Sequence, residues 1–248
     1  MMNDIHEIRK VAVMKSAFKQ KYGIPRQPRI VQDLKSEIVF DKEFNNPDAV
    51  RGLEEFSHIW LIWGFSDTKI DMSAEHPAWK PTVRPPRLGG NVRMGVFATR
   101  SPYRPNSLGM SAVKLVEIRN ENGQLSLIVE GADLLDGTPI YDIKPYIPYS
   151  DIITGAKEGF AHAEESSVEV DFPDELLEKV DEEFREPLIK ILELDPRDAY
   201  DRASGKPSKM AFANVDIEFV SRDDKLVVTE VRELLSNSRL AIEVTETR

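Results

Sequence analysis

The residues best suited to chemistry lie in one stretch, from Pro81 to Gly109, which is rich in proline and glycine and contains five arginines. With Lys80 added, the stretch has six cations and no Asp or Glu. Proline fixes φ and glycine permits positive φ, so the pattern predicts rigid turns around one short strand, Gly95 to Thr99. A guanidinium group makes two charge-assisted hydrogen bonds to a carboxylate or phosphate. We therefore interpret the stretch as an anion-binding loop, in preference to a basic loop that only faces solvent.

Three further loops carry polar side chains at the ends of predicted strands: Pro25 to Pro28, Ser66 with Asp67, and Asp133 to Asp151. Two prolines three residues apart exclude a helix interior or a central strand at Pro25 to Pro28, where a pocket wall and a plain surface turn are equally good interpretations. Loops at one rim of a closed sheet can converge on a ligand, and prolines reduce the entropy that such loops lose on binding. We expect these loops and the arginine stretch to form one site.

The composition excludes several classes of site. The sequence has no cysteine and four widely spaced histidines, so disulfides and metal sites are not expected. It contains no GxGxxG motif after a strand, no P-loop and no GxSxG motif, which leaves dinucleotide, nucleoside-triphosphate and α/β-hydrolase chemistry without support. No apolar run approaches the roughly 20 residues of a membrane span, and the first residues lack a signal peptide's apolar core. We expect a cytoplasmic protein with no membrane contact.

The net charge of -10 is unevenly distributed. Residues 160–195 contain thirteen acidic and three basic residues, which is the whole excess of negative charge. The remaining chain is neutral, and its cations are concentrated in the arginine stretch. A local basic patch on an acidic protein is therefore expected, and nucleic acid is not excluded as a partner.

Short alternating or apolar runs separated by turns predict strands through the first 150 residues. Asn122 and Gly123 between two such runs predict a hairpin, and Pro47 to Glu54, with Asn46 as N-cap, is the single helix expected there. Asp136 to Asp151 is expected to be turns. The predicted strands are His6 to Met14, Ser36 to Phe40, Phe56 to Phe65 (buried on both faces), Met110 to Asn120 and Leu125 to Leu135. The pattern indicates a mostly β fold, an antiparallel β-barrel.

A second, small α+β domain is expected after a boundary near residue 155, so that the domains are 1–155 and 156–248. Ser167 to Phe172 predicts a strand, and Pro173 to Leu194 predicts one amphipathic helix that Pro187 kinks or splits. Asp223 and Asp224 predict the turn of a final hairpin.

Several blocks of the sequence closely resemble the TrmO (TsaA-like) family of tRNA methyltransferases. The blocks are PRQP, VRGLEEFSHIWLIWGF, PTVRPPRLGGNVRMGVFATRS, RPNSLG and DLLDGTPIYDIKPYIP, within about residues 7–150, and LELDPRDAY resembles the C-terminal module of bacterial members. The resemblance implies a β-barrel methyltransferase, S-adenosylmethionine as methyl donor, a homodimer, and methylation of N6 of threonylcarbamoyladenosine at position 37 in the tRNA anticodon loop. Ser107 stands where many members have proline, which puts the rigidity of that loop in doubt.

The matching motifs also imply which residues line the donor pocket. Arg100 is expected to hold the donor's carboxylate and an Asp its ammonium group. For Asp136, a local turn in which the side chain bonds its own backbone is an equally good interpretation. The expected cofactor-binding residues are Pro25, Arg26, Gln27, Ser66, Asp67, Arg100, Met110, Asp133, Leu134, Leu135 and Asp136.

The tRNA is expected to contact a second set of residues. Trp79, Tyr103, Tyr141 or Tyr146 could stack on a splayed base. The second domain is expected to be a tRNA-binding accessory, so its deletion should weaken tRNA binding more than donor binding. The expected tRNA contacts are Arg84, Arg87, Arg93, Arg104, Lys144 and Tyr146.

The acceptor nitrogen belongs to a urea-like group and is weakly nucleophilic, so alignment and removal of its proton are both needed. We expect Asp142 to be the base, with Asp136 as second candidate. Two alternatives share the arginine loops: a non-catalytic barrel module that binds an anionic metabolite, and a methyltransferase for another acceptor.

Overall fold

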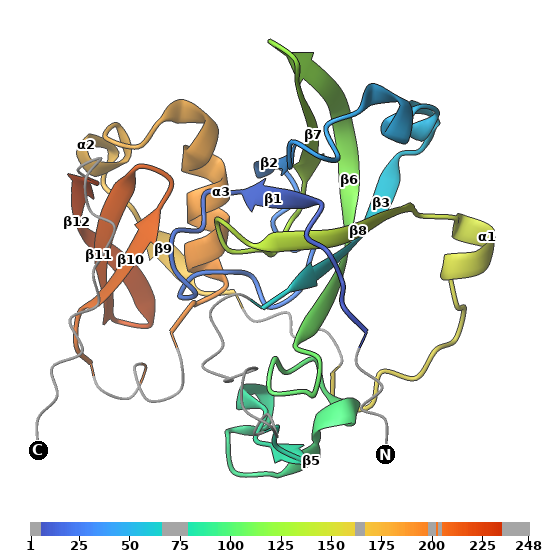
Figure 1. Ribbon diagram of the computed structural model, residues 1–248. Coiled ribbons are helices and arrows are strands. Elements are labelled where there is room, and N and C mark those ends of the chain that lie inside the picture. The colour runs from blue at the N-terminus through green and yellow to red at the C-terminus, as the bar shows by residue number, and fades with distance from the viewer. Residues whose placement is uncertain (1–5, 66–78, 162–166, 198–201, 203–204, 235–248) are drawn as a thin grey trace, which may run out of the picture.

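A computed structural model describes residues 6–65, 79–161, 167–197, 202 and 205–234 of the chain (Figure 1). In this described part, six antiparallel strands close into a barrel in the order β1-β2-β7-β6-β3-β8. The strands are β1 (Ala12–Lys15), β2 (Lys35–Phe40), β3 (His58–Gly64), β6 (Leu108–Glu121), β7 (Gln124–Glu130) and β8 (Pro139–Pro145). The predicted fold class, a mostly β protein with an antiparallel barrel, is confirmed.

The hairpin between β6 and β7 forms where the sequence predicts it. Asn122 and Gly123 have φ of 52° and 80°, the left-handed conformation that matches a two-residue turn to the twist of its strands. Glu121 pairs with Gln124 at the end of the ladder. Local turn chemistry therefore determines the register of this hairpin.

Strand β3 pairs with β6 on one side and with β8 on the other. Ile59, Leu61 and Trp63 are buried in the barrel core, whereas His58, Trp60 and Ile62 are only partly buried on the outer face. The prediction that both faces of this strand are buried is therefore wrong. The outer face keeps partial exposure because rings such as Tyr146 cover only some of it.

Two predicted elements of the barrel differ in the structure. Pro47 to Glu54 forms two 3-10 helices, Pro47–Val50 and Leu53–Glu55, because Gly52 between them has a left-handed φ of 87°. Asn46 caps the first, its side chain accepting from Asp48 N at 3.0 Å. Strand β8 lies where turns were expected; Pro139 and Pro145 stand at its two ends, where a missing N–H removes no central ladder bond.

The arginine stretch contains short β4 (Thr82–Val83) and β5 (Met94–Gly95), which pair with each other. The predicted strand from Gly95 to Thr99 is wrong, because the chain turns at Gly95 into a 3-10 helix, Val96–Ala98. Val96 is buried, and Thr99 Oγ1 donates to its carbonyl at 2.8 Å.

The C-terminal unit is a four-stranded sheet, in the order β10-β11-β12-β9, packed against helices. It contains β9 (Glu169–Asp171), α2 (Asp174–Leu177), α3 (Glu182–Glu193), β10 (Ser208–Phe212), β11 (Val215–Arg222) and β12 (Lys225–Glu233), while α1 (Pro148–Asp151) follows the barrel. The final hairpin forms at Asp223 and Asp224 as predicted. The predicted helix from Pro173 to Leu194 is interrupted, since Asp181 has the non-helical angles φ -55° and ψ 137° and Val180 is buried in the core. Pro187 lies inside α3.

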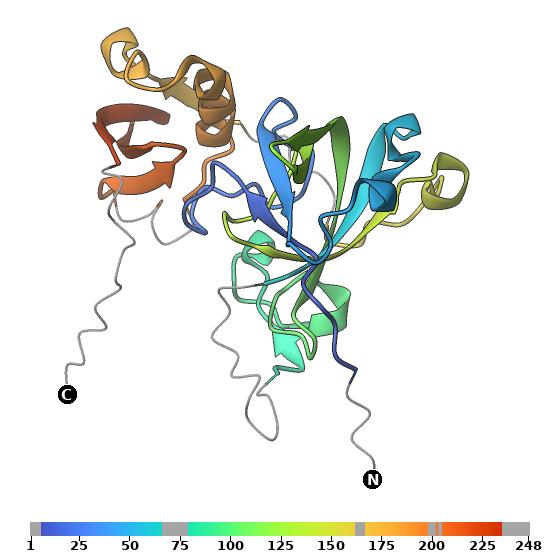
Figure 2. The same cartoon turned by 45° about the horizontal axis from the view of Figure 1, so that its top comes forward.

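The described part of the molecule has two hydrophobic cores. One fills the barrel. The other lies between the C-terminal sheet and α3, and it includes Phe18, Val31 and Leu34. These three residues belong to the connection between β1 and β2, residues 16–34, which we call the β1–β2 segment. Figures 1 and 2 show this blue segment between the barrel and the orange helix α3. The boundary near residue 155 stays a prediction.

Within the described residues, every helix is too short or too polar to span a bilayer.

Candidate functional site: a cavity at one end of the barrel

A cavity of about 770 Å³ opens where the barrel strands β3 and β6 meet the loops. Its size lies in the range typical of pockets for organic ligands. Its lining combines apolar surface with charged groups, which is the composition such pockets usually have. The lining residues are Lys21, Ile24, Pro25, Arg26, Gln27, Pro28, Ile62, Trp63, Phe65, Thr99, Arg100, Pro102, Tyr103, Arg104, Leu108, Gly109, Met110, Asp133, Leu135 and Thr138.

The barrel supplies one wall of the cavity, which we call the barrel wall: Ile62, Trp63, Gly109, Met110 and Asp133. The register of β3 and β6 places Ile62 opposite Met110 and Trp63 opposite Gly109. A Cβ atom at position 109 would lie 2.4 Å from the Trp63 ring, so only glycine leaves room for the indole. The ladder therefore holds these residues in one arrangement.

Asp133 is held by a directional chain of hydrogen bonds. The Trp63 Nε1–H donates to Ser111 Oγ at 3.0 Å, and Ser111 Oγ donates to Asp133 Oδ1 at 2.6 Å. An indole nitrogen can only donate, so the single Ser111 proton must point to the carboxylate. The bond from Ser111 therefore fixes the orientation of the Asp133 carboxylate at the cavity.

Burial raises the pKa of the Asp133 carboxyl, and the Ser111 hydrogen bond and the Arg100 charge oppose that rise. A partly buried carboxylate with a raised pKa gains most from a cationic ligand, because such a ligand compensates its lost hydration. The site is therefore suited to a molecule with a positively charged group.

Loops supply the opposite wall, which we call the loop wall: residues 21–28 and 99–104. An Arg100 Nη1 hydrogen bond to Gln27 Oε1 joins the two loops. Arg104 is turned back to its own loop, where Nη1 donates to the carbonyls of Thr99 at 3.2 Å and Ser101 at 3.4 Å. Arg26 and Arg100 are exposed, so their charges face the cavity and solvent together.

Most of the predicted donor-binding residues are brought together at this cavity. Leu134 is the exception within its turn, since it is fully buried in the barrel core. Asp136 lies outside the lining because it accepts from Ser16 N at 2.9 Å and pairs with Lys19 at 3.1 Å. Ser66 and Asp67 lie outside the described residues. The predicted residues that line the cavity are Pro25, Arg26, Gln27, Arg100, Met110, Asp133 and Leu135.

Asp142 lies on the outer face of the barrel, beside the cavity. It pairs across the ladder with Ile62, which in turn pairs with Met110. Directly opposite residues of a ladder point to the same face, so the three side chains share one surface. Asp142 is exposed and pairs with Lys144 at 3.1 Å, and it does not line the cavity itself.

The expected tRNA contacts are spread over several elements. Arg84 and Arg93 are exposed around β4 and β5, and Arg87 belongs to the 3-10 helix Pro86–Leu88. Arg104 lines the cavity, whereas Tyr146 packs on Trp60, with 5.6 Å between ring centroids.

Exposed aromatic rings lie in the arginine stretch. Phe97 is 71% exposed and stacks on Trp79, with centroids 6.1 Å apart and an interplanar angle of 28°. Tyr103 lines the cavity beneath Lys80, whose Nζ is 5.5 Å from the ring centroid. Sequence reasoning missed Phe97 because it was assigned to a strand.

Sequence reasoning also missed Ser111, Trp63 and Ile62. Their signal is the register of β3 against β6, which places Ile62 and Trp63 beside Met110 and Gly109. That register follows from pairing between distant strands, so the sequence could not supply it.

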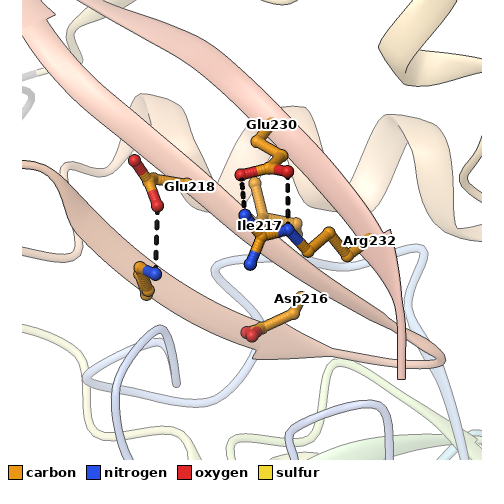
Figure 3. A pocket seen from close by; sticks show the side chains of 6 residues that line it. Asp216, Ile217, Glu218, Glu230 and Arg232 are labelled. Atoms are coloured by element: carbon orange, nitrogen blue, oxygen red, sulfur yellow. Dashed lines mark hydrogen bonds and ion pairs between the residues drawn. The ribbon is translucent and has the colours of Figure 1, made fainter. Parts of the chain in front are cut away.

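A second hollow, on the outer face of the C-terminal sheet, is a cluster of ion pairs with about 10 Å³ of free volume (Figure 3). Glu230 pairs with Arg232, and Glu218 pairs with Lys209 at 3.1 Å. The charges satisfy each other, so this hollow has the character of a solvated sheet face. Within the described part of the chain, no three His, Asp or Glu side chains are grouped so that they could hold a metal ion.

The fold is a closed antiparallel barrel, and its cavity among the rim loops is lined by both apolar and charged groups. These features are typical of β-barrel proteins that bind a charged organic molecule at one end of the barrel. A family model described as tRNA-methyltransferase O N-terminal domain matches residues 13–152. The chain belongs to this family, and the resemblance inferred from its sequence motifs is confirmed.

Similar proteins carry consistent names. The chain is 41% identical over 201 residues to the tRNA (adenine(37)-N6)-methyltransferase of Escherichia coli (strain K12), covering 78% of this chain and 83% of the relative. It is 47% identical over 177 residues to a putative S-adenosylmethionine-dependent methyltransferase of Pseudomonas aeruginosa, covering 71% and 70% of the two chains. A crystal structure of TrmO from P. aeruginosa superposes with a TM-score of 0.72 at 29% identity, covering 92% of this chain and 97% of the other.

Proposed function

We propose that this chain is an S-adenosylmethionine-dependent tRNA (adenine(37)-N6)-methyltransferase. Its relatives carry that name, and its family is that of tRNA-methyltransferase O. The observation that carries the proposal is the cavity, in which one oriented carboxylate and several guanidinium groups surround apolar surface.

The cavity lining fits the methyl donor. S-adenosylmethionine supplies a methyl group on a sulfonium, and it also has an ammonium, a carboxylate and an adenine. The Asp133 carboxylate suits a cationic group, and Arg100 suits the donor's carboxylate through charge-assisted hydrogen bonds. Ile62, Trp63 and Met110 offer apolar surface to the rest of the molecule.

The main catalytic contribution of the protein is alignment. A bound donor and an acceptor nitrogen held in line can gain about 7–11 kcal/mol from orientation, whereas a positioned base contributes about 10²- to 10⁴-fold. Asp142 is the proposed base: as the N6–CH₃ bond forms and the S–CH₃ bond breaks, its carboxylate takes the N6 proton. Its place opposite Ile62, on the surface that includes Met110, supports this role over Asp136, whose oxygens bond Ser16 and Lys19.

We propose the threonylcarbamoyl form of adenosine 37 as the acceptor, because its N6 belongs to a urea-like group that needs this help. Arg84, Arg87, Arg93 and Lys144 are proposed to contact anticodon-loop phosphates, so affinity should fall steeply with salt. Phe97 joins Trp79 and Tyr103 as a proposed stacking surface, since all three are exposed beside the cavity loops. A homodimer in the cytoplasm is part of the same proposal.

Transfer of labelled methyl groups tests the function. The full chain is incubated with labelled S-adenosylmethionine and tRNA with or without the threonylcarbamoyl group. We expect label at N6 of adenosine 37, and only in the modified tRNA. Donor binding without transfer to any RNA would favour a binding module, and equal labelling of both tRNAs would reject the proposed acceptor.

The base is tested by comparing Asp142→Asn with Asp136→Asn. We expect Asp142→Asn to lower turnover by about 10²-fold or more with unchanged donor affinity. Asp136→Asn should change stability more than turnover, because Asp136 bonds the β1–β2 segment. Near-normal turnover in Asp142→Asn would show that Asp142 is not the base.

A further inference from the structure

The β1–β2 segment, which carries part of the loop wall, is bonded to the barrel at both of its ends. Near its start, Ser16 Oγ donates to Leu134 O at 2.8 Å and Asp136 N donates to Phe18 O at 2.9 Å. Near its end, Arg29 N donates to Gly131 O at 2.8 Å. The barrel therefore holds the ends of the segment, and residues 21–28 lie between these attachments.

The C-terminal unit contacts the start of the same segment. Ala213 N donates to Ala17 O at 2.7 Å, and the Phe18 and Phe212 rings meet edge to face with centroids 5.8 Å apart. Phe18, Phe212 and Met210 are each at most 2% exposed, so this contact is part of a buried hydrophobic core. The segment is thus packed against the C-terminal unit as well as bonded to the barrel.

The backbone of Gly23, next to the cavity, also lies close to the C-terminal unit. A Cβ atom there would lie 2.1 Å from Met210 Sδ, and the residue has a φ of 91°. The following residue, Ile24, both lines the cavity and packs against the C-terminal core. The position of β10 therefore bears on where Ile24 lies with respect to the barrel wall.

We propose that the C-terminal unit is a structural part of the donor site, with Gly23 and Met210 as positioning residues that set the loop wall against the barrel wall. This adds a role in donor binding to the tRNA-binding role expected from the sequence. The inference rests on the proposed function, because it takes the cavity to be the S-adenosylmethionine site.

The test measures the affinity of the full-length chain for S-adenosylmethionine without tRNA, by calorimetry. Gly23→Ala places a methyl group against Met210 and should weaken donor binding by about tenfold. The matched control is Gly52→Ala: Gly52 has a φ of 87° but no atom lies within 4 Å of the position that its Cβ would take, so it shares the backbone strain and not the contact. Donor affinity in the control should equal that of the unaltered chain.

The partner residue gives a second, independent test. In the Gly23→Ala background, Met210→Ala makes room for the new methyl group, so the double variant should bind the donor more tightly than Gly23→Ala alone. Met210→Ala by itself should weaken binding by about threefold, since Gly23 and Ile24 lose their support. Val228→Ala truncates the same core on β12, which pairs with β11 and β9, and should leave donor affinity unchanged.

The outcomes separate the inference from the proposed function. Unchanged donor affinity in folded Gly23→Ala or Met210→Ala would overturn the inference alone. If Gly23→Ala does not fold, Met210→Ala against Val228→Ala decides it. Failure of the unaltered chain to bind S-adenosylmethionine would reject the proposed function, and this inference with it.

Discussion

The two walls of the cavity are built differently. In the barrel wall, Trp63 and Gly109 face each other across a continuous ladder, and Asp133 is fixed through Ser111. In the loop wall, the contact between Arg100 and Gln27 is exposed, and the support of residues 21–28 comes from a separate core. One wall is determined by the barrel alone, and the other by the meeting of the barrel with the C-terminal unit.

This difference suggests that the two walls have different functions. Ladder bonds and core packing hold groups to a fraction of an ångström, which suits the groups that orient a methyl donor. Exposed loop contacts contribute less energy and allow adjustment when a large substrate arrives. Changes in the barrel wall should therefore have larger effects than comparable changes in the loop wall.

The largest expected effect is that of Gly109→Ala. The new methyl group would lie 2.4 Å from the Trp63 ring and displace it, together with the chain of bonds to Asp133. Overpacking of about 1–3 kcal/mol, added to the loss of this orientation, should weaken donor binding by about 100-fold. Gly95→Ala is the control in the loops, because nothing lies within 4 Å of a Cβ atom there. Equal effects in the two variants, measured by calorimetry, would show that the contact of position 109 with Trp63 does not determine donor affinity.

The next largest effect is expected for Asp133→Asn. Loss of the charge should weaken S-adenosylmethionine binding by about 10- to 100-fold, the contribution typical of a charged hydrogen bond. Asn can still accept from Ser111, so the local structure should remain. Asp41→Asn, which alters a partly exposed carboxylate paired with Lys10, is the control and should bind normally.

Asp133→Asn should also change how the stability of the protein depends on pH. The pKa of Asp133 is raised, chiefly by burial, so its stabilising contribution is present below the unfolded pKa and is lost as pH rises through the folded value. Relative to the unaltered chain, Asp133→Asn should therefore gain stability between acidic and neutral pH. Thermal melts across that range check the sign, and a relative loss of stability at neutral pH would contradict it.

Ser111→Ala should have a smaller effect. Removing its hydroxyl takes away the bond that lowers the pKa of Asp133, so donor binding should weaken by about three- to tenfold at neutral pH. As the pH is lowered, donor binding by Ser111→Ala should also begin to weaken at a higher pH than donor binding by the unaltered chain. Ser111→Ala and the unaltered chain share the same cationic side chains at the cavity, which are Lys21, Arg26, Arg100 and Arg104. Ser36→Ala is the control, since the buried Ser36 hydroxyl has no hydrogen-bond partner within the described residues, and an identical pH profile in both variants would contradict the role of Ser111.

The smallest effect is expected for Gln27→Ala. Its bond to Arg100 is exposed, and exposed polar contacts contribute little, so donor affinity should fall only about twofold. Asn91→Ala, at an exposed position between β4 and β5, is the control. A tenfold loss in Gln27→Ala would place the loop wall on a level with the barrel wall.

Particular residues show how far sequence reasoning reached. The β6–β7 hairpin was predicted from Asn122 and Gly123 because a two-residue turn depends on its own φ angles. The strand predicted from Gly95 to Thr99 does not form, because the chain turns at Gly95 into a 3-10 helix in which Val96 is buried. Strand β8 was not predicted, because Asp136 to Asp151 was expected to form turns. Its partners β1 and β3 are distant in sequence, so local preferences do not indicate the pairing.

The sequence by itself determined the strand-rich fold, its tight turns and the stiff arginine loops, because these follow from steric preferences within a few neighbouring residues. Only the tertiary structure decided that Ser111 reaches Asp133, that Gly109 makes room for Trp63, and that Gly23 rests on Met210. Those contacts join residues far apart in the chain, and they depend on strand register and core packing, which local preferences do not specify.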